Sequence, residues 1–160
     1  MALFIHLTSE KNVKSILRNG IKVSNNGVVY AMPIIPNFYV SHQWLRELKN
    51  EGQRTICGIS FRIPDKELVS VGYFNQPHKE MTASAAASLL MNLDESLGYE
   101  VLIPRSIRRQ EIHKVRYLSQ LIGWRFYPKA RGNRPCPCSY CQRGRIKSRR
   151  IREAARVGRK

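Results

Sequence analysis

Three stretches of the 160-residue sequence set a chemically versatile side chain among apolar neighbours: His6 in FIHLTS, Tyr30 in GVVYAMP and Glu100 in GYEVLIP. Taken singly, each is more often structural, because a strand commonly presents one polar face. An imidazole, a phenol and a carboxylate can act together on a ligand only where the fold gathers them in one cleft. The elements that contain them decide whether they meet.

The expected elements combine short strands with early helices. Alternation of apolar and polar residues, with turn residues and prolines between, predicts strands at residues 3–8, 28–32, 55–63, 98–103, 115–119 and 122–127. Helical spacing and propensity predict helices at residues 9–19, 38–49 and 81–92, the first capped by Ser9 and ended by Gly20. This order, which contains no internal repeat, is typical of an α+β domain.

The composition indicates a self-supporting core. The chain carries 42% apolar residues and a formal charge of +17, from 28 Lys and Arg against 11 Asp and Glu. A chain of this length can fold without disulfides, so its four cysteines predict a reducing compartment. No apolar run reaches the roughly 18 residues of a membrane span, and the first residues lack a signal-peptide pattern. We therefore expect a cytoplasmic protein without membrane contact.

Positive charge is concentrated at the C-terminal end. Residues 129–160, named here the basic tail, hold 12 Lys and Arg and one acid, whereas residues 1–128 hold the apolar periodicity of the expected folded domain. Such a tail neutralises phosphates and gives salt-sensitive affinity for nucleic acid, although a solvated tail is the alternative. The residues expected to contact nucleic acid are Arg134, Arg143, Arg145, Lys147, Arg149 and Arg150.

The basic tail also contains Cys136, Cys138 and Cys141, three potential thiolate ligands within six residues. A structural zinc site needs four ligands, so Cys57 or His113 would have to complete it through space. Zinc would then order the tail and present its arginines on a defined surface. Free thiols are the alternative, since the spacing lacks a paired CxxC repeat. For Cys57, the alternation of its strand also indicates a place in the core.

In the order and settings of His6, Tyr30 and Glu100, the sequence resembles the ADP-ribosyltransferase superfamily, in the branch of diphtheria toxin and the poly(ADP-ribose) polymerases. The resemblance covers roughly residues 3–128 and implies a split antiparallel β core with flanking helices. It also implies that NAD is bound and consumed. His6 would bond its adenosine-side ribose, Thr8 would be a further NAD contact, Tyr30 would stack on nicotinamide, and Glu100 would be the catalytic glutamate.

Two further motifs extend the resemblance. Ser41-His42-Gln43-Trp44 fits the family's Ser-x-x-Tyr with tryptophan for tyrosine, which implies that Ser41 bonds the nicotinamide amide and that Trp44 is a second stacking face. The interval from Tyr30 to Ser41 is a few residues longer than in the family. GYEVLIP also resembles the glutamate strand of DarT-type DNA-modifying toxins. The arginine that those toxins place after the second strand has no counterpart here.

The chemistry implied by the resemblance is cleavage of the nicotinamide glycosidic bond, which develops positive charge on the ribose. Glu100 would offset that charge and hold the ribose 2′-hydroxyl. An acceptor must then reach the anomeric carbon ahead of water. Candidates for the acceptor side are His42, Arg46 and Glu47, for which an ordinary helix surface is the alternative.

The sequence therefore predicts an NAD-dependent mono-ADP-ribosyltransferase of toxin or defence-effector type that modifies a nucleic acid, with RNA slightly favoured over DNA. A protein acceptor is an alternative, and an antitoxin or regulatory protein is a possible partner. A second alternative is an RNA 2′-phosphotransferase of the same superfamily fold, in which Glu100 has no evident role. The third is a non-enzymatic, zinc-dependent RNA-binding module.

Overall fold

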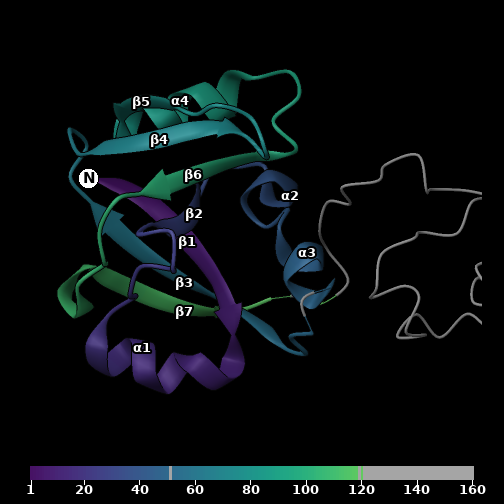
Figure 1. The fold of residues 1–160 in the computed structure, drawn as a ribbon, viewed down its shortest axis with the longest axis vertical. Helices are drawn as coiled ribbons and strands as arrows, with labels where there is room; N and C mark the ends of the chain where they lie inside the picture. The colour runs from purple at the N-terminus through teal and green to yellow at the C-terminus, as the bar shows by residue number, and fades with distance from the viewer. Residues whose placement is uncertain (51, 119, 121–160) are drawn as a thin grey trace, which may run out of the picture.

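The computed structural model describes residues 1–50, 52–118 and 120 as an α+β fold built on one seven-stranded sheet (Figure 1). The strands are β1 (Ala2–Ser9), β2 (Val29–Pro33), β3 (Ile56–Ile63), β4 (Leu68–Tyr73), β5 (Lys79–Thr82), β6 (Tyr99–Ile103) and β7 (Ile112–Tyr117). They lie in the order β5-β4-β6-β2-β1-β3-β7, and each pairing is antiparallel. The prediction of an α+β fold is confirmed.

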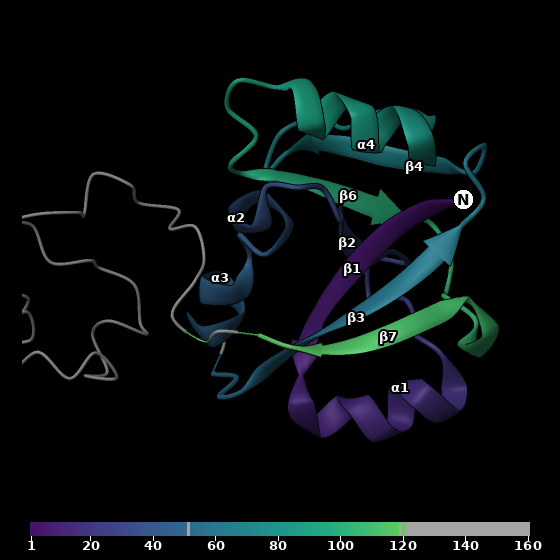
Figure 2. The same cartoon turned by 180° about the vertical axis from the view of Figure 1, so that it is seen from behind.

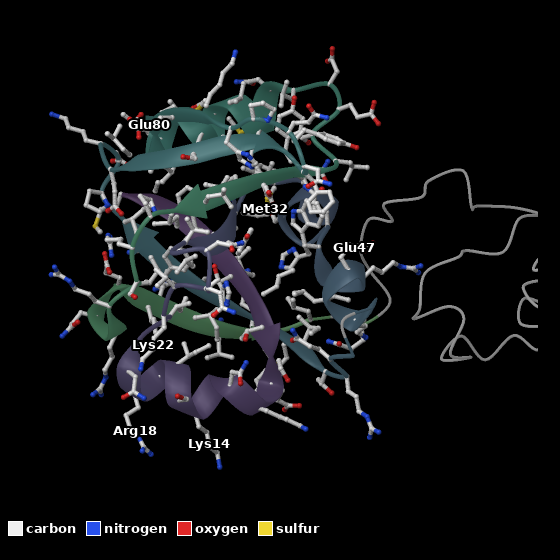
Figure 3. The ribbon with its side chains drawn as sticks, in the orientation of Figure 1. Lys14, Arg18, Lys22, Met32, Glu47 and Glu80 are labelled. Carbon is white, nitrogen blue, oxygen red and sulfur yellow. The ribbon has the colours of Figure 1, made fainter. Side chains whose placement is uncertain are left out.

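The sheet consists of two halves that meet along a short seam. β1 pairs with β3 from Ala2 to Ser9, but it pairs with β2 only through Phe4 opposite Pro33 and Ile5 opposite Met32. Beyond Ile5 the ladder between β1 and β2 ends, so β7, β3 and β1 form one half, and β2, β6, β4 and β5 form the other. Met32, labelled in Figure 3, marks the seam. This arrangement fits a split β core.

The helices cover different parts of the sheet. α4 (Ala83–Asn92) packs on β4 and β5 and reaches β1 and β2, whereas α1 (Val13–Asn19) lies at the opposite end of the molecule (Figures 1 and 2). Two 3-10 helices, η1 (Glu10–Asn12) and η2 (Arg109–Glu111), both contact α1. Gly20 ends α1 with φ +81°, and a Cβ at Gly20 would overlap the Ile107 carbonyl oxygen. A glycine is needed there because α1 docks on the segment before η2.

One predicted helix is wrong. Instead of a single helix over residues 38–49, the chain forms α2 (Phe38–Ser41) and α3 (Leu45–Asn50). At the break, the buried Gln43 side chain donates from Nε2 to the carbonyls of Val40 and Ser96, both at 3.2 Å, and its Oε1 accepts from the Gly98 N–H. These bonds fasten the connection to the chain that leads into β6, at the cost of a continuous helix.

Other differences lie between residues 64 and 82 and at element ends. The hairpin of β4 and β5 is not expected, and β5 includes residues 81 and 82 of the predicted helix. α4 therefore begins after β5, two residues later than predicted, with Thr82 Oγ1 accepting from the Ala85 N–H. Ser9 makes no side-chain cap bond, and β7 begins three residues before the expected strand. The strand expected at 122–127 and the boundary at residue 128 lie outside the described residues. Within those residues, no helix has the length and apolar character needed to cross a membrane.

Candidate functional site

His6 lies where β1 and β2 separate. Its Nδ1 is 2.8 Å from the carbonyl oxygen of Tyr30, which would otherwise face the main chain of a paired β1. A carbonyl only accepts, so Nδ1 carries the proton. Burial lowers the pKa of His6, and the opposing effect of the Tyr30 hydrogen bond is smaller. The imidazole is therefore neutral at pH 7, with Nε2 as a hydrogen-bond acceptor.

Tyr30 and Glu100 share one face of the β2–β6 pair. Tyr30 is opposite Leu102, and Glu100 precedes Leu102 by two residues and therefore lies on the same face. Such diagonal neighbours are roughly 7–8 Å apart. The Tyr30 side chain is 39% exposed, and its hydroxyl accepts from Asn26 Nδ2 at 3.0 Å. The hydrogen bond from Asn26 thus fixes the hydroxyl group, while part of the ring is exposed to solvent.

Glu100 occupies the middle of the second half of the sheet, paired with Gly72 of β4. Its side chain is only 14% exposed, and its Oε1 lies 3.2 Å from Nε2 of His78. Burial raises the pKa of Glu100, and the nearby His78 opposes that rise. A carboxyl group perturbed by desolvation and a specific partner is typical of functional sites.

His78 is a site residue that the sequence analysis missed. It follows the turn after β4, where Asn75 adopts a φ of +62° and the Gln76 N–H bonds the Tyr73 carbonyl at 3.0 Å. A Cβ on Gly72 would come within 2.8 Å of the His78 ring. The glycine therefore provides the space in which His78 lies against the Glu100 strand. A glycine inside an alternating strand is the sequence signal for such a close approach.

Trp44 and Ser41 are placed by bonds within the protein. Trp44 donates from Nε1 to the carbonyl of Tyr99, the residue before Glu100, at 2.9 Å, and its ring lies 5.6 Å from that of Phe74. Ser41 Oγ donates to the Pro33 carbonyl at 2.9 Å and is buried. Trp44 is thus next to the Glu100 strand. Ser41 instead uses its proton to fasten α2 to the end of β2.

The remaining predicted residues are more dispersed. Thr8 is buried, and its Oγ1 accepts from Asn12 Nδ2 at 3.1 Å near the start of α1. His42 is also buried, in the connection between α2 and α3, whereas Arg46 and Glu47 lie partly exposed on α3, where Figure 3 labels Glu47. Of the three acceptor-side candidates, only the two on α3 are open to a molecule from solvent.

The predicted zinc site falls mostly outside the described residues, since Cys136, Cys138 and Cys141 all follow residue 120. Cys57 lies in the core, as expected, and burial together with nearby Glu10 raises the pKa of its thiol. His113 is exposed on β7. Zinc binds thiolate rather than thiol, so His113 fits the role of fourth ligand better than Cys57 does. The residues expected to bind nucleic acid also lie beyond residue 120.

Comparison of the chain with protein-family models, with curated proteins and with solved structures gave no match. The described residues define an α+β domain with a seven-stranded antiparallel sheet, and they bring an imidazole, a phenol and a carboxylate to three strands that are neighbours in that sheet.

Proposed function

We propose that the protein is an NAD-dependent mono-ADP-ribosyltransferase. The observation that carries the proposal is the arrangement of His6, Tyr30 and Glu100 on β1, β2 and β6, beside the seam of a split sheet. These residues are separated by up to 94 positions in the chain, yet the His6 ring contacts the main-chain carbonyl of Tyr30, and the Tyr30 side chain shares a strand face with Glu100. The fold thus supports a common site for residues that the sequence pattern grouped.

The chemical state of each side chain fits the role that the resemblance implies. Neutral His6 offers an acceptor nitrogen to a ribose hydroxyl. The open ring of Tyr30 offers a face for offset stacking on nicotinamide, worth about 1 kcal/mol beyond burial. Glu100, partly desolvated, interacts more strongly with developing positive charge than an exposed carboxylate does.

In NAD, the glycosidic bond joins the ribose to nicotinamide, a good leaving group. Cleavage of this bond develops positive charge on the ribose, which the protein must stabilise. Glu100 provides the negative charge and accepts a hydrogen bond from the ribose 2′-hydroxyl. Ser41 has its hydroxyl proton engaged at Pro33, so the nicotinamide amide must find another partner. Trp44 stands at the start of β6, where it can limit water beside the reacting carbon.

A nucleic acid is the proposed acceptor. Besides the charge of the basic tail, the positive charge of the folded domain supports this proposal. Exposed lysine and arginine side chains on and next to η1, α1 and η2 form what we name the basic face: Lys11, Lys14, Arg18, Lys22, Arg108 and Arg109. The two segments are docked, because the Ile21 and Ile107 main chains exchange hydrogen bonds at 2.9 and 2.8 Å. In Figure 3, Lys14, Arg18 and Lys22 project away from the body of the domain.

The test is incubation of the purified full chain with NAD labelled on its adenylate part, together with separate pools of RNA, single-stranded DNA, duplex DNA and cell protein. We expect label in a nucleic-acid pool, and RNA before DNA. Label in protein alone would refute the nucleic-acid acceptor but retain the enzyme class. If nicotinamide is not released from NAD in any pool, the proposed activity is wrong.

The other two functions predict different results with the Glu100→Gln variant. An RNA 2′-phosphotransferase would remove a 2′-phosphate from RNA and would keep that activity without the carboxylate. A zinc-dependent RNA-binding module would bind RNA equally well with and without Glu100. Under the proposed function, the substitution abolishes transfer while RNA binding and folding survive.

A further inference from the structure

Among the described residues, the ion-pair partner of Glu100 is a histidine that the three-residue pattern does not include. Nε2 of His78 lies 3.2 Å from Glu100 Oε1, and the two side chains are 17% and 14% exposed. The two residues belong to different parts of the sheet. His78 precedes β5, whereas Glu100 lies inside β6, and β4 lies between these two strands. The imidazole therefore has to cross over β4 to reach the carboxylate.

This crossing depends on a specific feature of β4. Gly72 is the residue of β4 that pairs with Glu100, and its missing side chain leaves the space that the His78 ring occupies. The neighbouring pair, Tyr73 and Tyr99, lies edge to face at 5.8 Å on the opposite face of the strands. A histidine serving only as filler has no need to direct a ring nitrogen at a buried carboxylate.

We propose that His78 is a positioning residue for Glu100: its Nε2 lies 3.2 Å from Oε1 and pairs with that oxygen, so that Oε2 is directed at the substrate. The inference rests on the proposed function, since it assigns Glu100 a reacting partner. A carboxylate fixed at one oxygen loses its rotational freedom before the substrate arrives, and such preorganisation lowers the cost of reaching the transition state. A protonated His78 also favours the ionised form of Glu100 in a desolvated place.

Among the described residues, His78 is the charged group that acts against the effect of burial on Glu100. Lys79 and Glu80, which follow His78 on β5, are exposed, and Tyr73 and Tyr99 lie on the other face of the strands. Burial raises the pKa of Glu100 and His78 lowers it. Loss of His78 removes the opposing influence, so the pKa of Glu100 rises further and the carboxylate is lost at a higher pH.

Three variants of the full chain separate orientation from charge. His78→Leu removes the polar contact and the charge, whereas His78→Gln keeps a polar donor but not the charge. Glu80→Gln, at an exposed position of β5 two residues after His78, is the matched control. For each, nicotinamide release from NAD is followed between about pH 5 and about pH 9, the range in which carboxyl and imidazole groups titrate, and melting curves monitor folding.

We expect His78→Leu to lower kcat roughly 10²-fold, the cost of a misplaced catalytic group, with little change in KM for NAD. His78→Gln should keep most of kcat above pH 7, but the acid side of its profile should move up by about one pH unit. Glu80→Gln should match the unmodified protein. A His78→Leu protein that keeps the normal kcat and pH profile would overturn the inference while leaving the proposed function intact.

A second measurement does not depend on turnover. Carbon-13 NMR of labelled glutamate carboxyls gives the titration of Glu100, assigned by its absence in Glu100→Gln. The Glu100 pKa should be higher in His78→Leu than in the unmodified protein, and an unchanged titration would contradict the inference. If the unmodified protein releases no nicotinamide, the proposed function fails and the positioning role falls with it.

Discussion

The two halves of the sheet differ in charge and in chemistry. The half made of β1, β3, β7 and α1 carries the basic face, on which the acids are Glu10 and Glu111. The half made of β2, β6, β4, β5 and α4 leans acidic at its surface, with Asp65, Glu80, Asp94 and Glu95 exposed beside Lys66 and Lys79. Figure 3 places Glu80 at the end of the molecule opposite Lys14 and Arg18.

The comparison indicates a division of labour across the seam. The second half carries Tyr30 and Glu100 on one face of β2 and β6, with His78 paired to Glu100 and the Trp44 indole bonded to the main chain of Tyr99, whereas His6 is the contribution of the first half. The first half instead has the charge that attracts phosphates. A polyanion held on the basic face would approach the site from one side of the seam. The following predictions test how far the halves depend on one another, from the largest expected effect to the smallest.

In the described part of the chain, Arg105 forms ion pairs that join the two halves. It follows β6 and forms two hydrogen bonds to Glu67 before β4 and two to Glu111 before β7, at 2.6–2.7 Å. Hydrogen bonds to charged groups are the strong kind, so Arg105→Ala should lower the free energy of unfolding by about 2 kcal/mol. Chemical denaturation measures this value, with the exposed Arg109→Ala as the control.

The same link predicts a pH dependence. Burial acts to raise the pKa of Glu111, but its bonds to Arg105 and to the Arg108 N–H prevail and lower it. A carboxyl group with a lowered pKa stabilises the fold above its ordinary pKa and loses that effect as pH falls. The difference between Arg105→Ala and the unmodified protein should therefore shrink in acid. Equal stability of the two proteins at neutral pH would show that the halves hold together without Arg105.

Charge reversal on the basic face should weaken nucleic-acid binding without affecting NAD cleavage. In the double variant Lys14→Glu/Arg18→Glu, the slope of log affinity against log salt should fall by about two, one for each lost phosphate contact. The matched control is Lys66→Glu/Lys79→Glu on the acidic half. Equal losses for both variants would mean that net charge, rather than the basic face, binds the nucleic acid.

Glu100→Gln should stabilise the second half of the sheet. Burial raises the pKa of Glu100 above its ordinary 4.5, so ionising it costs folding free energy once pH exceeds that value. The melting temperature of the variant should be about 2–4 °C higher at neutral pH, which corresponds to about 1 kcal/mol in the free energy of unfolding for a chain of this size. This gain should vanish in acid. Exposed Glu80→Gln should change nothing. A lower melting temperature for Glu100→Gln would contradict the assigned burial cost.

The parts of the fold that sequence patterns predict are those set by local alternation. β1, β3 and β6 have it, and their positions are confirmed within one or two residues. β5 has the sequence KEMT, mostly polar at the sheet edge, and only its pairing with β4 makes it a strand. The break between α2 and α3 comes from bonds of Gln43 to Ser96 and Gly98, some 55 residues away, which no local pattern contains.

The site divides in the same way. His6, Tyr30 and Glu100 stand in apolar strands, so their settings marked them. His78 stands between a turn and a polar strand, and its importance follows from the register that sets Gly72 opposite Glu100. Ser41 matches a motif, yet its hydroxyl proton serves the Pro33 carbonyl, a use that depends on where α2 meets β2. The local sequence marks candidate site residues, but the hydrogen-bond and ion-pair partners of those residues depend on tertiary contacts.

The most direct test of the central claim is release of nicotinamide from NAD by the purified full chain, compared with Glu100→Gln and Glu80→Gln. The two substitutions make the same chemical change, one at a mostly buried position on β6 and the other at an exposed position on β5. We predict normal release by Glu80→Gln and a loss of at least about 10²-fold for Glu100→Gln, the scale for a group acting on the transition state. Equal release by all three proteins would contradict the account.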